Sequence, residues 1–347
     1  MRRHDVDCLR VIALGLLIFY HAVVAFQPWA KDIFFIQNKE TLEDLWPFMS
    51  MLNVWRIPIL FIVSGMSVCF AMEHRTWKSF LKDRALRILL PFIFGLICIC
   101  PISLSIAMAY YDMEIVYWPN SGHLWFLVNI FVYVLVLLPF MWHLKNRSHH
   151  FIFRFLSRLF QCPGGLYILA LPMIVEASVV QPQIFSFYAG TSHGFWLGLV
   201  CFLVGFISVS LKGVFWGAVE KIRHVALGLA FILYLIRLLV FELEGPSALT
   251  AFESVNWIFA ILGYGSVYLN MPSKIMSYLS KAVYPVYIVH MPVQFFFSHY
   301  LFSLSLPPSS KLLIMVISTF SCSLLLYELI IRRTKWIRLL FGMKIRT

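Results

Sequence analysis

Charged residues are scarce in this sequence, and acidic residues are scarcer than basic ones. Asp, Glu, Lys and Arg make up 13% of the 347 residues, whereas soluble domains carry about 25%. The chain also lacks a low-complexity tract, an internal repeat and a polar stretch long enough for a soluble appendage. A water-soluble globular fold of this length is therefore excluded, because its surface would need far more charge.

The sequence also has no regular pattern of disulfide or metal ligands. Its seven cysteines fall inside apolar runs or in basic loops, which does not indicate a disulfide framework. The histidines are scattered, without the close spacing on one element that metal sites use. We therefore expect neither disulfide bonds nor a metal site.

Long apolar runs are abundant instead. Hydrophobic residues make up 61% of the chain and the mean hydropathy is +0.83. The runs are close to 20 residues long and unbroken, which is typical of membrane-spanning helices, whereas barrel strands alternate over about ten residues. The runs cover residues 9–28, 52–72, 88–110, 123–143, 165–181, 193–211, 224–242, 252–270, 282–303 and 311–331. The sequence thus predicts an all-α, polytopic integral membrane protein with about ten transmembrane helices, forming one domain over residues 1–347.

The loops between these runs alternate in charge. One set holds 23 of the 28 Lys and Arg residues, and the opposite set is mainly acidic. Because cytoplasmic loops are enriched in Lys and Arg, the basic set and both termini are expected in the cytoplasm. The basic residues are Arg2, Arg3, Arg10, Arg75, Lys78, Lys82, Arg84, Arg87, Lys145, Arg147, Arg154, Arg158, Lys212, Lys221, Arg223, Lys274, Lys281, Arg332, Arg333, Lys335, Arg338, Lys344 and Arg346. The net charge of +12 therefore indicates contact with membrane lipids and no nucleic-acid partner.

A few ionisable residues fall inside the predicted spans, where a charged side chain is costly and a functional role is the first hypothesis. The candidates are Arg10, His21, Glu176, Arg237, His290 and Glu328. His21 follows Arg10 by 11 residues, which is about 16 Å of helix and three turns, so both side chains share one face. His290 lies inside a run that also enters from the cytoplasm, so the two histidines are expected at a similar depth.

Structural interpretations of these residues remain open. Composition alone favours Arg10 as a topology anchor, and His21 alone is equally well explained by a hydrogen bond to a neighbouring helix. Glu176 and Arg237 are expected to form a structural ion pair. Glu328 is expected to pair with a basic residue one turn later.

The residues at the start of the fourth span also have two interpretations. His123 and Trp125 belong to the run His-Leu-Trp-Phe-Leu, where an interfacial cap and an aromatic belt are the simpler explanations. The residues alone therefore predict a buried polar cavity with at least one histidine and a basic cytoplasmic mouth. They do not distinguish an enzyme from a transporter.

Several segments in order along the chain form a recognisable set of motifs. They are Arg2 to Arg10, the Arg10 and His21 pair, Arg56-Ile57-Pro58, Phe61 to Met66, Arg84 with Arg87 and Pro91, residues 123–127, Tyr284 to Pro292, and Tyr327-Glu328 with Arg332. Together they resemble the family-3 membrane acyltransferases, within the branch that is similar to glucan biosynthesis protein C. The resemblance runs from residue 2 to about 340.

This resemblance implies transfer of an acyl group, acetyl or succinyl, from cytoplasmic acyl-coenzyme A to a hydroxyl of an envelope or periplasmic glycan or a lipid-linked acceptor. It implies no permanently bound cofactor, since acyl-coenzyme A is the donor substrate, and it implies the bacterial inner membrane. His21 is then the catalytic base, or alternatively a transient acyl acceptor. The donor-binding residues are Arg10, Lys82, Arg84 and Arg87, whose charges suit the phosphates of coenzyme A.

The remaining assignments follow from the same resemblance. His123, Trp125, Tyr287 and His290 are expected to line the site or the acceptor mouth, and Glu328 to hold the last helix in place. The alternative function is a transporter or flippase of acyl or glycan groups, which thioester turnover would separate from the enzyme. The identities of donor and acceptor and the oligomeric state are left open.

Overall fold

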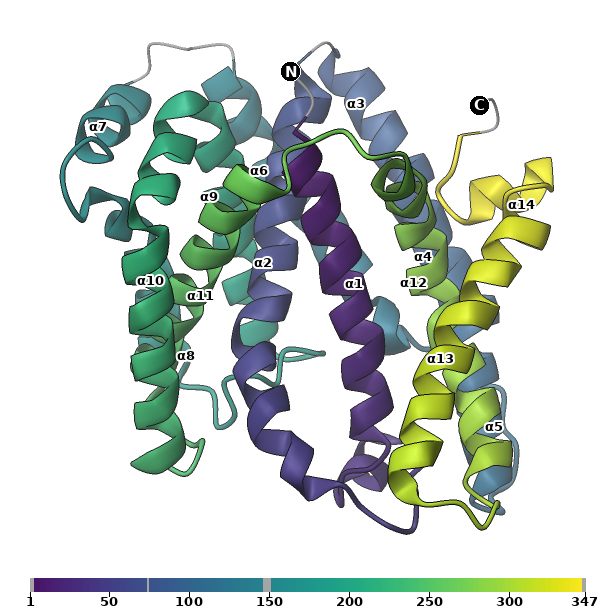
Figure 1. Cartoon of the computed structure of the whole chain (residues 1–347). Coiled ribbons are helices and arrows are strands. Elements are labelled where there is room, and N and C mark those ends of the chain that lie inside the picture. Colours follow the sequence, from purple (N-terminus) through teal and green to yellow (C-terminus); the bar gives the residue numbers. More distant parts are fainter. Residues whose placement is uncertain (1–2, 74, 146–150, 345–347) are drawn as a thin grey trace. The chain divides into compact units, whose positions relative to one another are not determined.

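The protein is helical in all of its regular elements over the described residues 3–73, 75–145 and 151–344 of the computed structural model (Figure 1). Its helices are α1 (His4–Val24), α2 (Trp46–Met72), α3 (Trp77–Arg84), α4 (Leu90–Phe94), α5 (Cys100–Tyr110), α6 (Trp125–Lys145), α7 (Phe151–Leu159), α8 (Leu171–Val180), α9 (Ser192–Ser210), α10 (Gly213–Leu239), α11 (Ser247–Tyr268), α12 (Lys274–Leu301), α13 (Pro308–Leu326) and α14 (Lys335–Leu340). The all-α prediction is confirmed. Arg2, Arg147 and Arg346, three of the predicted cytoplasmic cations, lie outside the described residues.

A helix occupies each of the ten predicted runs, and within the described part of the chain seven helical segments are long and apolar enough to cross a membrane. These seven are His4–Val24, Glu43–Met72, Trp77–Tyr110, Gly122–Lys145, Ser192–Ser210, Gly213–Leu239 and Pro308–Ile331. Gly165–Val180 is a shorter apolar segment, in which a 3₁₀ turn gives way to α8 just before Pro172. Helices α11 and α12 hold buried polar residues, such as Glu253 and His290, that lower their hydropathy. The polytopic class is thus confirmed, with an approximate count.

The chain divides into two compact units, and the single domain over residues 1–347 stays a prediction. The first unit comprises Met1–Arg10, Ser50–Leu81 and Asn129–Ser273, and the second comprises Val11–Met49, Lys82–Val128 and Lys274–Thr347. Helix α1 therefore contributes its first turns to one unit and the rest to the other.

Close backbone contact organises the first unit. A Cβ atom on Gly65 of α2 would lie 1.9 Å from the carbonyl oxygen of Phe202, and one on Gly205 of α9 would lie 1.9 Å from that of Ile62. The two glycines thus let α2 and α9 approach each other closely, as small residues do in membrane helix pairs. Helices α10 and α11 lie side by side, and α8 packs against α9 and α11 (Figure 1).

The second unit is built around α12, which packs against α5 and α13 (Figure 1). The segment from α3 to α5 stays helical through two π turns, Ala85–Leu89 and Gly95–Ile99. Each π turn comes just before a proline, Pro91 or Pro101. Because proline has no N–H and crowds the preceding turn, the wider turns let this long helix continue.

Candidate active site

Two histidines from opposite ends of the sequence meet in the second unit. His21 lies in the last turn of α1, and His290 is fully buried in the middle of α12. The Nδ1 atom of His21 lies 3.0 Å from the Nε2 atom of His290. The two rings are nearly parallel, with 3° between their planes. The structure therefore joins the two residues in one hydrogen-bonded pair.

A backbone carbonyl fixes the direction of this hydrogen bond. The Nδ1 atom of His290 lies 2.6 Å from the carbonyl oxygen of Tyr287, which can only accept. Nδ1 of His290 must therefore carry a proton, and in the neutral ring its Nε2 is an acceptor. His21 then donates from its own Nδ1, which leaves the basic lone pair of a neutral His21 on Nε2. The geometry thus selects the tautomer of His21 that a general base requires.

His123 and Tyr287 complete this cluster. The Nε2 atom of His123 donates to the carbonyl oxygen of Ile288 over 3.1 Å, and the hydroxyl of Tyr287 donates to the carbonyl oxygen of His123. The His123 ring stands edge-on to that of His290, with centroids 5.0 Å apart. These reciprocal contacts hold the 3₁₀ turn Gly122–Leu124 against the middle of α12.

Gln294 is a site residue that the sequence analysis missed. Its side chain is fully buried, and its Nε2 donates to the carbonyl oxygen of His21 over 2.8 Å. That carbonyl is one of the last four of α1, which have no regular helical partner of their own. Gln294 follows His290 by one helical turn, so this spacing was the signal available in the sequence.

The loop after α1 supplies a second missed residue, Phe35. The Phe35 ring lies against the imidazole of His21, with centroids 5.8 Å apart, and against Phe295 of α12, with centroids 5.5 Å apart. No sequence pattern distinguished Phe35 from the other aromatic residues of its loop. Its position depends on how the loop folds back.

The predicted donor-binding residues lie at the start of the long helix that runs from α3 to α5. Lys82 is exposed on α3, Arg84 ends α3, and Arg87 lies in the following π turn. Both arginines form ion pairs with Asp83, at 2.9 Å for Arg84 and 3.0 Å for Arg87. The four residues keep a net positive charge, but one carboxylate already occupies part of the arginine hydrogen-bonding capacity.

The structure gives each of three other predicted site residues contacts of its own. Arg10 belongs to the first unit, where its guanidinium pairs with Asp7 at 3.3 Å. Trp125 begins α6 and packs edge-on against Phe126. Glu328 lies in the π turn Tyr327–Ile331 at the end of α13.

The contacts of Glu328 hold the end of α13. Its carboxylate accepts hydrogen bonds from Arg332, four residues later, and from the hydroxyl of Tyr278 at 2.8 Å. The expected local ion pair is therefore present, and Tyr278 adds a link between the start of α12 and the end of α13.

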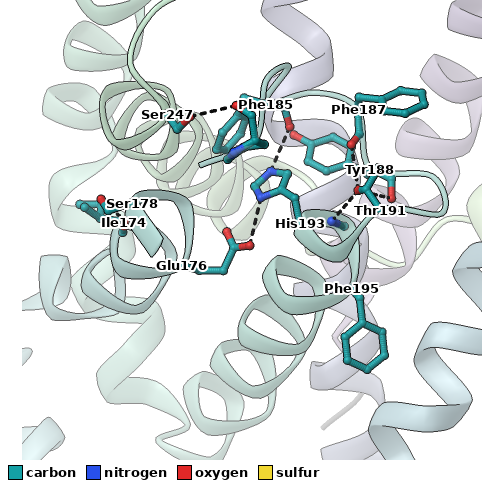
Figure 2. Close-up of polar contacts among 12 residues, drawn as sticks. Ile174, Glu176, Ser178, Phe185, Phe187, Tyr188, Thr191, His193, Phe195 and Ser247 are labelled. Carbon is teal, nitrogen blue, oxygen red and sulfur yellow. Dashed lines mark hydrogen bonds and ion pairs between the residues drawn. The ribbon is translucent and has the colours of Figure 1, made fainter. Parts of the chain in front are cut away.

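The expected ion pair between Glu176 and Arg237 is wrong. Figure 2 shows the imidazole of His193 between the Glu176 carboxylate and the backbone at Phe185. The distances are 3.0 Å from Nδ1 to Glu176 Oε1 and 3.0 Å from Nε2 to the Phe185 carbonyl oxygen. Both nitrogens of His193 thus have an oxygen partner in this buried pair. It fastens the loop before α9 to α8.

Arg237 has a different partner. Its guanidinium binds both carboxylate oxygens of Glu253, at 2.6 and 3.0 Å, and donates to Ser50 Oγ at 2.7 Å. Arg237 and Glu253 are both buried, so this bidentate pair satisfies charges that would otherwise be costly in the membrane. Arg237 and Glu176 are therefore structural parts of the first unit, each with its own partner.

The chemistry that this arrangement supports is proton transfer at His21. Among the described residues no group of three potential ligands is placed to hold a metal ion. A base with a fixed tautomer, backed by a second imidazole, matches the general requirement for activating a hydroxyl.

Comparison with known protein families agrees with this chemistry. A family model described as an acyltransferase domain matches residues 3–328, which include every predicted site residue. Comparisons with curated proteins and with solved structures find no match. Since the model covers nearly the whole chain, the chain belongs to the family-3 acyltransferases and is a multi-pass membrane enzyme that transfers acyl groups other than amino-acyl groups.

Proposed function

We propose that the protein transfers an acetyl or succinyl group from cytoplasmic acyl-coenzyme A to a hydroxyl of an envelope or periplasmic glycan, or of a related lipid-linked acceptor. The observation that carries this proposal is the 3.0 Å hydrogen bond between His21 and His290, whose direction the Tyr287 carbonyl sets. A hydroxyl is a weak nucleophile near neutral pH. The His21 imidazole, with its lone pair on Nε2, is a base that can accept the hydroxyl proton.

In this proposal Nε2 of His21 takes the proton of the acceptor hydroxyl as the oxygen attacks the thioester carbonyl. The carbon–sulfur bond breaks, the ester bond forms, and coenzyme A leaves as a thiol after receiving the proton. His290 keeps the hydrogen bond to Nδ1–H throughout, so it orients His21 and stabilises the positive charge that develops on the ring. Tyr287 and Gln294 hold the two partners through the backbone contacts described above.

An alternative route proceeds through an acyl group bound covalently to His21. There Nε2 of His21 attacks the thioester carbonyl, the carbon–sulfur bond breaks and coenzyme A leaves as a thiolate. The acceptor hydroxyl then attacks the acyl-imidazole, the nitrogen–carbon bond breaks to free His21, and the hydroxyl proton converts the thiolate to a thiol. Rapid native intact-mass measurement near neutral pH on a reaction without acceptor distinguishes the two, because an acyl-imidazole hydrolyses quickly in acid. An acyl adduct that disappears in His21→Ala supports the covalent route, whereas no adduct during steady turnover supports direct transfer.

We assign donor binding to Lys82, Arg84 and Arg87, with Arg10 as a further basic residue of the cytoplasmic face. Coenzyme A carries several negative charges on its phosphates, which guanidinium groups bind through paired hydrogen bonds. Asp83 holds Arg84 and Arg87 in place before the donor arrives. His123 and Trp125 are assigned to the acceptor side of the site.

The proposed orientation in the inner membrane places both termini on the cytoplasmic side and the loop with Phe35 on the periplasmic side. Cys162 is exposed between α7 and α8, in a loop assigned to the cytoplasm, and Lys39 is exposed in the loop assigned to the outside. A membrane-impermeant maleimide applied to intact cells should label Lys39→Cys and leave Cys162 unlabelled until the membrane is opened. The reverse pattern would invert the topology.

The function is tested by coenzyme A release from the purified protein in liposomes, with acetyl- or succinyl-coenzyme A and a pool of oligosaccharide acceptors. We expect release that depends on acceptor and is lost in His21→Ala. His224→Ala is the matched control, because His224 is an exposed histidine of α10 that bonds Tyr264. Failure of the wild type to bind or turn over any acyl-coenzyme A would refute the proposed donor.

A further inference from the structure

Phe35 covers the proposed catalytic base on the side of the first loop. Its ring lies at 56° to the His21 imidazole and at 55° to the ring of Phe295, in contact with both. Phe295 is buried in α12, one turn after Met291. The Phe35 ring therefore lies against both His21 of α1 and Phe295 of α12.

The loop that carries Phe35 is held by several side chains. The hydroxyl of Tyr111, at the end of α5, donates to the Phe35 carbonyl oxygen over 2.8 Å and accepts from the Gln37 N–H over 3.0 Å. The buried Lys311 of α13 donates to Asn38 Oδ1 over 3.3 Å. The ring is thus presented to His21 by a backbone that is fixed on both sides, and not by a freely moving loop tip.

The neighbouring residue Phe34 provides a contrast within the same loop. It adopts a left-handed backbone conformation, with φ of 60°, at the end of the 3₁₀ turn Ala30–Ile33. This conformation turns the chain, and the Phe34 side chain is 60% exposed. The two adjacent phenylalanines therefore differ in position, and of the two only Phe35 has a described ring contact with His21.

We infer that Phe35 is a specificity-determining residue that keeps water from the His21 base, so that the acyl group passes to the hydroxyl acceptor and not to water. The inference rests on the proposed function. Water is a competing nucleophile for the same base: it would give up one proton to His21, attack the thioester and yield a carboxylic acid and the coenzyme A thiol. An active site that excludes water suppresses such a side reaction.

Phe35 can exclude water because of the size and the low polarity of its ring. The Phe35 ring is apolar and contacts the imidazole directly, so no water molecule can occupy the same position. An acceptor whose binding displaces the ring brings its own hydroxyl into that position. Truncation to alanine would leave a space large enough for water while the loop anchors at Tyr111 and Lys311 remain.

The test compares acceptor-independent and acceptor-dependent coenzyme A release in four variants. Phe35→Ala should raise release without acceptor about tenfold, which corresponds to about 1.4 kcal/mol, and should lower the fraction of acyl groups that reach the acceptor. Phe35→Leu should stay close to the wild type, because an apolar side chain of similar size remains. Phe34→Ala should also match the wild type, and the double variant with His21→Ala should lose the hydrolysis.

The outcomes separate this inference from the proposed function. If the wild type transfers acyl groups in a His21-dependent way and Phe35→Ala shows no increase in hydrolysis, the role of Phe35 is refuted and the function stands. If the wild type consumes no thioester, the function fails first. A Phe35→Ala protein that loses transfer and hydrolysis together, while its thermal unfolding matches the wild type, would make Phe35 a binding residue and would also overturn the inference.

Discussion

Replacing His290 with alanine removes the acceptor of the His21 Nδ1–H hydrogen bond and leaves His21 in place. The bond spans 3.0 Å between a residue of α1 and a residue of α12, and Tyr287 holds His290 in its accepting tautomer. Without His290, the His21 ring loses both its orientation and a partner for the positive charge that forms during proton transfer.

The size of the effect follows from the kind of hydrogen bond. A hydrogen bond to a charged group contributes about 1.5–3 kcal/mol, and each 1.36 kcal/mol is tenfold in rate. His290→Ala should therefore lower kcat by about 10- to 150-fold, with a smaller change in the KM for the donor. His290→Gln should recover part of this loss, because the glutamine carbonyl oxygen can accept from Nδ1–H.

The assay is steady-state release of coenzyme A with saturating acceptor, on proteins whose thermal unfolding has been compared. A His290→Ala rate within twofold of the wild type would refute the orienting role of the pair. A His290→Gln protein that is as impaired as His290→Ala would show that the hydrogen bond to Nδ1 is not what His290 contributes.

Three further predictions concern other contacts. Arg87→Gln should raise the KM for acyl-coenzyme A, and only by about two- to fivefold because the guanidinium is partly exposed. Asp83→Asn should lower this KM, because it releases the Arg87 guanidinium from its ion pair. Equal shifts in both variants would contradict this donor site. Gln294→Leu should lower kcat about 2- to 13-fold by removing the hydrogen bond to the His21 carbonyl, and an unchanged kcat would exclude that support. His193→Ala should lower the free energy of unfolding by about 3–5 kcal/mol, because it leaves the buried Glu176 carboxyl group without its imidazole partner. An unchanged midpoint of thermal unfolding in detergent would contradict this prediction.

The lipid-facing architecture could be predicted from the sequence because it depends on local properties. A run of about 20 apolar residues must form a helix in a bilayer, whatever its neighbours, since every backbone polar group has to be satisfied within the segment. Helix ends were less accurate: α10 begins at Gly213, 11 residues before the predicted run at 224. Polar residues can extend a helix beyond the hydrocarbon region, and hydropathy does not detect them.

Partner choice among the polar residues could not be predicted in the same way. The sequence predicts a pair of Glu176 with Arg237, two opposite charges within predicted spans, but the structure pairs Glu176 with His193 and Arg237 with Glu253. His193 is the second residue of α9 and Glu253 lies in the second turn of α11, and the sequence gives no sign that either side chain turns inward.

The sequence by itself determined that this protein spans a membrane, belongs among helical proteins, and carries a histidine deep in its first span, because hydropathy, charge bias and motif order are written along the chain. Only the tertiary structure decided what His21 touches. His290 lies 269 residues away, and the hydrogen bond exists because α1 and α12 pack in one unit. The tautomer of His21 and the place of Phe35 against it likewise depend on a carbonyl of α12 and on a folded loop, which are properties of position in space and not of residue type.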